Sequence, residues 1–294
     1  MHKKIGYHIL ITGLKVGLGL ILSSGAAIAQ QYVTNAPTQE EMYCSGLIND
    51  KQVPGDSYVI SGENSRYKTS FTTGDYIYIN QGAEHGVKVG DEFDVVRPVN
   101  DMEASNVWFK YQTALTRAMG TRYADIGRVR VVHVDAKTST TEIDVPCGLI
   151  QRGDIVRPFA ARPAPQFHNM KFDAFAPPSG KKTAMVVTAK DYQVLAGTGK
   201  IVYINLGSAQ GVRVGDYFRV FRYQGTHIET DYQVRDTAYK AFGFGSAPVA
   251  YQWNNLPRQN LGEGIVLRTG NNSSTVLLTS MRWEIYIGDY VELE

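Results

Sequence analysis

The chain has 294 residues, among them 29 glycines and 18 tyrosines, and a formal net charge of +2 at pH 7. Residues 1–29 contain three lysines and no acidic residue, so the remaining residues carry a net charge of −1. A nucleic-acid-binding surface needs Lys and Arg clustered on one face, and this sequence supports none. The high glycine content is typical of all-β proteins with many turns.

Residues 1–29 have the pattern of a secretory signal peptide. The three lysines supply a positive region, Val16–Leu22 a short apolar core, and Ala27–Ala29 a cleavage site of the small-x-small type. The alternative is a transmembrane anchor, but the apolar run is shorter than the about 20 residues that a spanning helix needs. We therefore expect an exported protein, periplasmic or at the cell surface or secreted, with no membrane span after cleavage.

One stretch of the chain occurs twice. Residues 78–97 read YINQGAEHGVKVGDEFDVVR, and residues 203–222 read YINLGSAQGVRVGDYFRVFR, at a constant offset of 125. A second pair, residues 127–156 and 262–291, aligns at an offset of 135. Because the identities fall on apolar, Gly and Asp positions, the sequence predicts an all-β fold of two tandem small β-barrel-like domains, SH3-like or related.

Local patterns within the first copy predict its strands and turns. Tyr76–Ile79 is typical of a strand, and Val87 and Val89 are expected to anchor a compact loop. Residues 92–97 alternate with the period of two that a half-buried strand has.

These patterns divide the chain into four parts. Residues 1–29 are the signal peptide, 30–157 the first β-barrel repeat with an N-terminal extension, and 183–294 the second repeat. Residues 158–182 contain five prolines and are expected to form an extended linker. Phe167, Phe172 and Phe175 of this linker indicate that it packs along a domain.

The two copies differ in their insertions, at about residues 98–126 and 223–261. In the first insertion, Ser105 is expected to cap a short helix that ends near Gly120. Aromatic residues are concentrated in both insertions, where they could bind sugars or proteins, or could instead cover the open ends of the barrels. The candidate binding surface comprises Trp108, Phe109, Tyr111, Tyr239, Phe242, Tyr251 and Trp253.

Both cysteines, Cys44 and Cys147, lie after the signal peptide. An even number of cysteines in an exported protein favours a disulfide, which here would close a loop of about 100 residues and contribute roughly 4–5 kcal/mol in the chain-entropy model. The alternative is two buried free thiols. A metal site is less favoured, because two cysteines without CxxC spacing lack further ligands.

No catalytic motif or cofactor-binding motif is found in the sequence. Residues 179–183 and 197–200 resemble phosphate-binding loops, but both depart from the required Gly and Lys-Ser/Thr positions. The histidines after the signal peptide have no metal-ligand spacing, and no Gly-x-Ser-x-Gly nucleophile motif occurs. We therefore expect no enzyme activity, no cofactor and no metal.

Four Gly-Asp pairs at equivalent positions of the two copies are the sharpest recurrent polar feature. Each Asp is expected to accept a hydrogen bond within its own turn, and the alternative is that these carboxylates bind Ca²⁺. The four residues are Asp91, Asp154, Asp216 and Asp289.

The repeat, with its motif Tyr-Ile-Asn-x-Gly-x-x-x-Gly-Val-x-x-Gly-Asp-x-Phe-x-Val, resembles the C-terminal domain of flagellar assembly protein T. It is also similar to uncharacterised exported bacterial proteins, some of them labelled lysin-motif proteins. The resemblance covers about residues 76–157 and 200–292 and implies a small β-barrel-like unit without enzyme activity in a periplasmic assembly.

Together these features predict an exported, non-enzymatic structural or interaction protein of the bacterial cell envelope, whose partner is an envelope protein or a cell-wall glycan. The alternative is a module that binds peptidoglycan or another polysaccharide through the aromatic insertions. An envelope hydrolase is least favoured, because no acid–base pair can be assigned.

Overall fold

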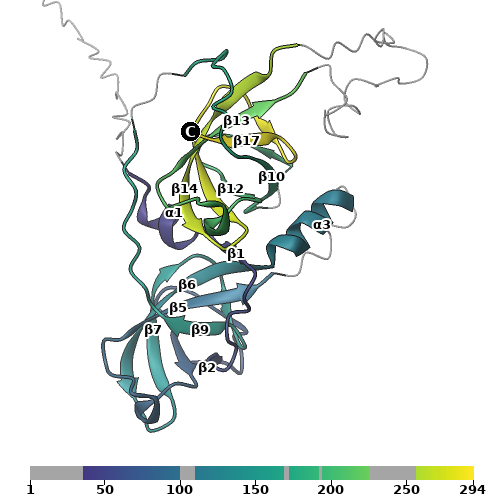
Figure 1. The fold of residues 1–294 in the computed structure, drawn as a ribbon. Coiled ribbons are helices and arrows are strands. Elements are labelled where there is room, and N and C mark those ends of the chain that lie inside the picture. Colours follow the sequence, from purple (N-terminus) through teal and green to yellow (C-terminus); the bar gives the residue numbers. More distant parts are fainter. Residues whose placement is uncertain (1–35, 100–109, 169–171, 192–193, 225–255) are drawn as a thin grey trace, which may run out of the picture. The chain divides into compact units, whose positions relative to one another are not determined.

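The computed structural model describes residues 36–99, 110–168, 172–191, 194–224 and 256–294 of the chain. Residues 34–294 form one compact unit in which strands predominate (Figure 1). The prediction of an all-β protein with two barrel-like domains is confirmed.

The first barrel follows a short helix, α1 (Gln39–Tyr43), and the part of it that the structure describes contains nine strands. They are β1 (Leu47–Asn49), β2 (Val59–Gly62), β3 (Ser70–Phe71), β4 (Tyr76–Ile79), β5 (Glu92–Pro98), β6 (Thr121–Val134), β7 (Ser139–Pro146), β8 (Ile150–Gln151) and β9 (Ile155–Pro158). A 3₁₀ turn, η1 (Ala83–His85), follows β4, and helix α3 (Lys110–Met119) lies between β5 and β6.

The described residues of the second barrel form eight strands and a matching 3₁₀ turn, η2 (Ser208–Gln210). The strands are β10 (Thr183–Ala189), β11 (Leu195–Ala196), β12 (Ile201–Ile204), β13 (Tyr217–Arg222), β14 (Gln259–Thr269), β15 (Ser274–Met281), β16 (Ile285–Tyr286) and β17 (Tyr290–Leu293). Its main sheet has the order β10-β12-β15-β14-β13-β17, and the first barrel has the corresponding order β2-β4-β7-β6-β5-β9. The two copies of the repeat thus have the same topology.

The second sheet is a closed barrel, whereas the first is a curled sheet. In the second, β10 pairs with β17, and Leu293 N donates to Lys182 O at 3.0 Å. The counterpart of Leu293 in the first copy is Pro158, which has no N–H to donate. Tyr58, just before β2, pairs with Ile155 of β9 in one isolated bridge. We call this incompletely paired junction of β2 and β9 the seam.

The outer faces of the two barrels also differ. In β4, Tyr76 and Tyr78 are 41% and 38% exposed, whereas their counterparts in β12, Ile201 and Tyr203, are buried. An apolar cluster covers this face of the second barrel and comprises Met42, Tyr43, Ala164, Phe167, Ile201, Tyr217, Ile265, Leu267 and Leu277. Helix α1 and the segment after β9 thus bury the outer face of the second barrel.

Two details of the predicted repeat were wrong. Val87 is buried as expected, but Val89 is 66% exposed and anchors nothing. Residues 92–97 do not keep a strict alternation, since Asp94 and Val96 are buried as well. The register shift near Val95 skips Ile126 of β6, so β5 itself has no extra residue, and Asp94 is buried on the other face of β5, where it pairs with Arg157 at 3.2 Å.

The predicted helix of the first insertion is confirmed as α3. Its predicted cap, Ser105, lies outside the described residues. Leu115 and Met119 of α3 pack against Ile48, Val187 and Tyr203, so the helix contacts the second barrel. Within the described part of the chain, no helix combines the length and the hydrophobicity required to cross a membrane.

Candidate functional site

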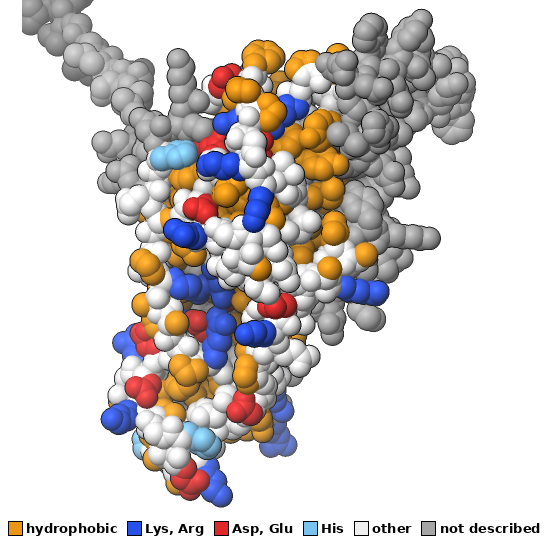
Figure 2. Space-filling model, viewed as in Figure 1, with side chains coloured by type: hydrophobic (Ala, Val, Ile, Leu, Met, Phe, Trp, Pro, Cys, Tyr) orange, Lys and Arg blue, Asp and Glu red, His pale blue; other side chains and the backbone are white. Residues whose placement is uncertain are grey.

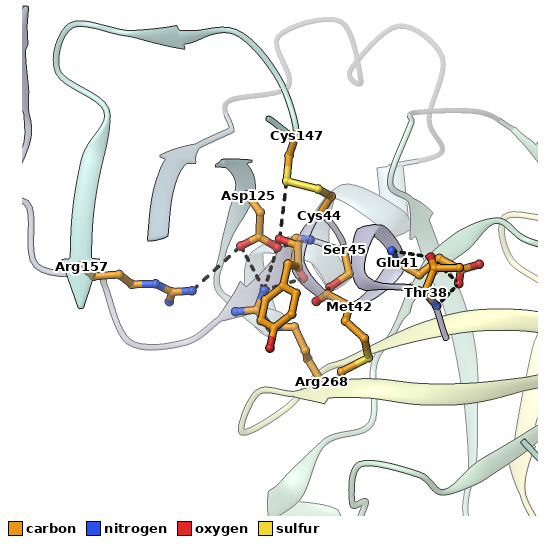
Figure 3. Close-up of a disulfide and its surroundings, with 11 residues drawn as sticks. Thr38, Glu41, Met42, Cys44, Ser45, Asp125, Cys147, Arg157 and Arg268 are labelled. Carbon is orange, nitrogen blue, oxygen red and sulfur yellow. Dashed lines mark hydrogen bonds and ion pairs between the residues drawn. A yellow bond between two sulfur atoms is a disulfide. The ribbon is translucent and has the colours of Figure 1, made fainter. Parts of the chain in front are cut away.

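The predicted disulfide between Cys44 and Cys147 is confirmed (Figure 3), and the alternative of two free thiols is excluded. The two Cα atoms lie 5.3 Å apart, and the residues are separated by 103 positions. Cys44 is the C-cap of helix α1, and the helix begins with a capping box in which Thr38 and Glu41 bond reciprocally. The disulfide therefore fixes a capped helix to the loop after β7.

The segment after the disulfide, residues 45–49, touches both barrels, and we call it the junction segment. Its strand β1 pairs with β6 of the first barrel. Three of its carbonyl oxygens accept hydrogen bonds from side chains of the second barrel: Ser45 from Tyr203 at 2.9 Å, Gly46 from Thr275 at 3.2 Å, and Ile48 from Ser273 at 2.6 Å. The junction segment thus links the two copies of the repeat through buried backbone groups.

A buried ion pair lies beside the junction segment. Asp125 of β6 contacts Arg268 of β14 at 2.9 and 3.1 Å and accepts a hydrogen bond from Gly46 N at 2.8 Å. Figure 3 shows Asp125 between Arg268 and Arg157, whose guanidinium is 3.9 Å away. The side chains of Asp125 and Arg268 are 3% and 11% exposed. Because such groups have lost most of their water, removing either one would leave a costly unpaired charge.

The counterpart of Asp125 in the second barrel is Asn260, which is also buried. Its Nδ2 donates to the carbonyl oxygens of Asp173 and Ala176 at 3.2 and 3.1 Å. In both barrels, therefore, a buried polar side chain at the start of the long central strand holds a segment that passes outside the barrel.

Arginines also pack on aromatic rings next to the disulfide. The guanidinium of Arg162 lies 4.7 Å from the ring centre of Tyr43, and that of Arg128 lies 4.8 Å from the ring of Phe159. Burial, together with the positive charge of Arg268, lowers the pKa of Arg162 to about 10. Arg162 therefore remains charged at neutral pH, and these contacts are cation–π interactions.

Each Asp of the four Gly-Asp pairs accepts the backbone N–H of the residue three positions earlier. The bonds are Lys88 N to Asp91, Gln151 N to Asp154, Arg213 N to Asp216 and Tyr286 N to Asp289, all between 2.7 and 2.8 Å. Asp154 and Asp289 also pair with equivalent arginines, Arg97 and Arg222. Burial raises the pKa of Asp289, although Arg222 opposes the shift. These bonds support the turn interpretation of the four residues.

The first barrel has a pocket of about 570 Å³ at one end of the seam. It is lined by Gln81, by residues 85–87 and 90–93, and by Pro158 and Phe159 at the end of β9. Its polar groups include Asp91 and Glu92. A pocket with apolar walls and a few polar groups is the usual form of a binding site.

A second polar cluster involves His168, Glu263 and Glu294, whose possible ligand atoms lie within 4.8 Å of one another. His168 Nε2 is 2.9 Å from Glu263, and Glu294 is 2.7 Å from Arg219. Burial raises the pKa of Glu263. These side chains could hold a cation, but each carboxylate already has a nitrogen partner, so the cluster is also stable by itself.

Most of the predicted aromatic surface lies outside the described residues. This applies to Trp108, Phe109, Tyr239, Phe242, Tyr251 and Trp253. Tyr111 belongs to the first turn of α3. The binding surface formed by these residues stays a prediction.

The sequence reasoning missed Asp125, Arg268 and Arg162. Two signals were present: Asp125 is a single acid between Ala124 and Ile126 in a strand, and Arg268 replaces the His133 of the first copy. Neither signal indicates that Asp125 and Arg268 pair with each other.

Comparisons of the chain with models of protein families and with the sequences of curated proteins give no match. The resemblance of the repeat to the C-terminal domain of flagellar assembly protein T, and to lysin-motif proteins, stays a prediction.

Proposed function

We propose that this chain is an exported, non-enzymatic structural or interaction protein of the bacterial cell envelope. The observation that carries the proposal is the disulfide and the junction segment behind it, which bind both copies of the repeat. Disulfides persist in oxidising compartments and are rare in the cytosol, which agrees with the signal-peptide pattern of residues 1–29.

The use of the buried charges supports a scaffold role. Asp125 holds Arg268 and the junction segment, and Asp154 and Asp289 each hold a turn and an arginine. In an enzyme, strongly perturbed groups would be expected to converge on a cleft. Here these carboxylates are hydrogen-bonded within the fold, which is the arrangement expected of groups that stabilise it.

Charges on the visible face are mixed (Figure 2). Lys and Arg side chains lie beside Asp and Glu side chains, without a stripe of one sign among the described residues on this face. A mixed surface of this kind suits contact with a protein better than contact with a nucleic acid.

The glycan-binding alternative depends on the aromatic residues of the insertions. No observation among the described residues favours glycan binding over protein binding, and the experiment below distinguishes the two.

The proposal is tested by fractionation of cells that produce the full chain and a variant lacking residues 1–29. We expect the full chain in the envelope or medium with an intact Cys44–Cys147 disulfide, and the variant in the cytosol with reduced thiols. Purified protein is then incubated with cell-wall sacculi. Retention that is lost in Trp108→Ala and Trp253→Ala variants would favour glycan binding. Cytosolic location of the full chain would refute the proposal.

A further inference from the structure

The pocket of the first barrel occupies a position that the second barrel fills with its own chain. Val59 N donates to Asp154 O in the first barrel, and Val186 N donates to Asp289 O in the second, so these two valines are equivalent. Four positions before these valines lie Lys182 in the second barrel and Gly55 in the first, so Lys182 corresponds to Gly55. Lys182 Nζ donates to Gln210 O of η2 at 2.7 Å and so crosses this corner of the second barrel. Gly55 has no side chain, so the corner of the first barrel stays open.

The loop next to this corner is also covered in one barrel and open in the other. Gly215 and Gly90 are equivalent residues of this loop. A Cβ added to Gly215 would lie 3.5 Å from Pro165 Cβ, whereas a Cβ added to Gly90 would have no neighbouring atom within 4 Å. His168 stacks on the ring of Tyr217 at 3.5 Å. An extended, proline-containing segment thus lies over the second barrel at the site that forms part of the pocket in the first.

The pocket differs from its counterpart in charge. Glu92 stands where the second barrel has a tyrosine, and it joins Asp91 in the lining. Arg128 lies at a long distance of 3.9 Å from Glu92, and its guanidinium also lies over Phe159. Arg130 is opposite Glu92 in the pair of β5 and β6, but it bonds to Asp144. The side chain of Glu92 is 32% exposed. The pocket therefore favours a positively charged occupant.

We propose that this pocket binds an extended polypeptide segment of a partner protein and that a Lys or Arg of this segment takes the place of Lys182. The apolar walls accept the body of the segment, and Glu92 and Asp91 accept its charge. Pro158 has no N–H with which to close the seam, so the site stays open. This inference rests on the proposed interaction function and assigns a partner surface to it.

The experiment titrates the full disulfide-bonded chain with a synthetic peptide of the sequence of residues 177–186, which contains Lys182. Amide chemical shifts in NMR report the site. We expect saturable shifts in residues 85–93 and at Phe159, and weaker binding of a peptide in which both lysines are replaced by Glu. Absence of saturable shifts at millimolar peptide, or shifts confined to residues 210–218, would overturn the proposal.

Glu92→Lys should weaken peptide binding about five- to tenfold, because it replaces an attraction with a repulsion. Glu84→Lys is the matched control, since Glu84 is an exposed acid in η1 that does not line the pocket, and it should bind within about twofold of the unaltered protein. Glu92→Gln, with a smaller effect, serves if the Lys variant fails to fold. Equal binding by the Glu92 and Glu84 variants would refute the site. A protein that still reaches the envelope but binds no peptide would refute this inference alone.

Discussion

The ion pair between Asp125 and Arg268 gives the sharpest test of how the two repeats are joined. Asn in place of Asp125 keeps an acceptor for Gly46 N but presents an amide to the guanidinium, whose charge then stays buried and unpaired. Breaking a buried pair on one side costs about 3–5 kcal/mol. Because the hydrogen bond from Gly46 N survives, we expect Asp125→Asn to lower the free energy of unfolding by about 3 kcal/mol, the lower end of this range. Urea unfolding of the disulfide-intact protein measures this loss.

A matched control is Asp144→Asn in the same barrel. Asp144 pairs with Arg130, whose side chain is 50% exposed, so this change should cost less than about 1 kcal/mol. Arg268→Gln completes a double-mutant cycle with Asp125→Asn, and the two losses should be non-additive by more than about 1 kcal/mol. A loss below about 1 kcal/mol for Asp125→Asn, or additive losses, would show that the pair does not couple the repeats.

Three further predictions concern the same region. Replacement of Cys44 and Cys147 by Ser should lower the free energy of unfolding by about 4–5 kcal/mol, measured in urea, because the unfolded chain regains a loop of 103 residues; an unchanged midpoint would contradict this. Burial raises the pKa of Tyr203 to about 12, so its neutral form is favoured in the folded state. The stabilisation from the neutral hydroxyl is complete below pH 10, and about 2–3 kcal/mol of it is lost as the pH rises towards 12. The unfolding free energy of the unaltered protein should therefore fall by this amount relative to that of Tyr203→Phe across the same pH range. Gly46→Ala should destabilise more than Gly86→Ala in thermal unfolding. Both have positive φ, but a Cβ on Gly46 would lie 2.5 Å from the Tyr203 hydroxyl, whereas Gly86 faces open space. Equal losses would refute the contact.

The sequence by itself determined the features that depend on neighbouring residues. The repeat of residues 78–97 at 203–222 predicted two barrels, because glycines at positive φ, such as Gly90 and Gly215, shape the same turns wherever they occur. Helical spacing predicted α3, and the turn chemistry of Gly-Asp predicted the role of Asp91. The two errors, Val89 and the alternation of residues 92–97, came from an exposed loop position and from a strand that is buried on both faces, which period alone does not reveal.

The tertiary structure alone decided which distant groups meet. Asp125 and Arg268 are 143 residues apart, and no local pattern pairs them. The same holds for the closure of the barrels, since the missing N–H of Pro158 matters only where a strand has to meet β9. The pocket of the first barrel likewise arises because Gly55 stands where the second barrel has Lys182. Contacts of this kind depend on the three-dimensional path of the chain, whereas strands and turns depend on neighbouring residues.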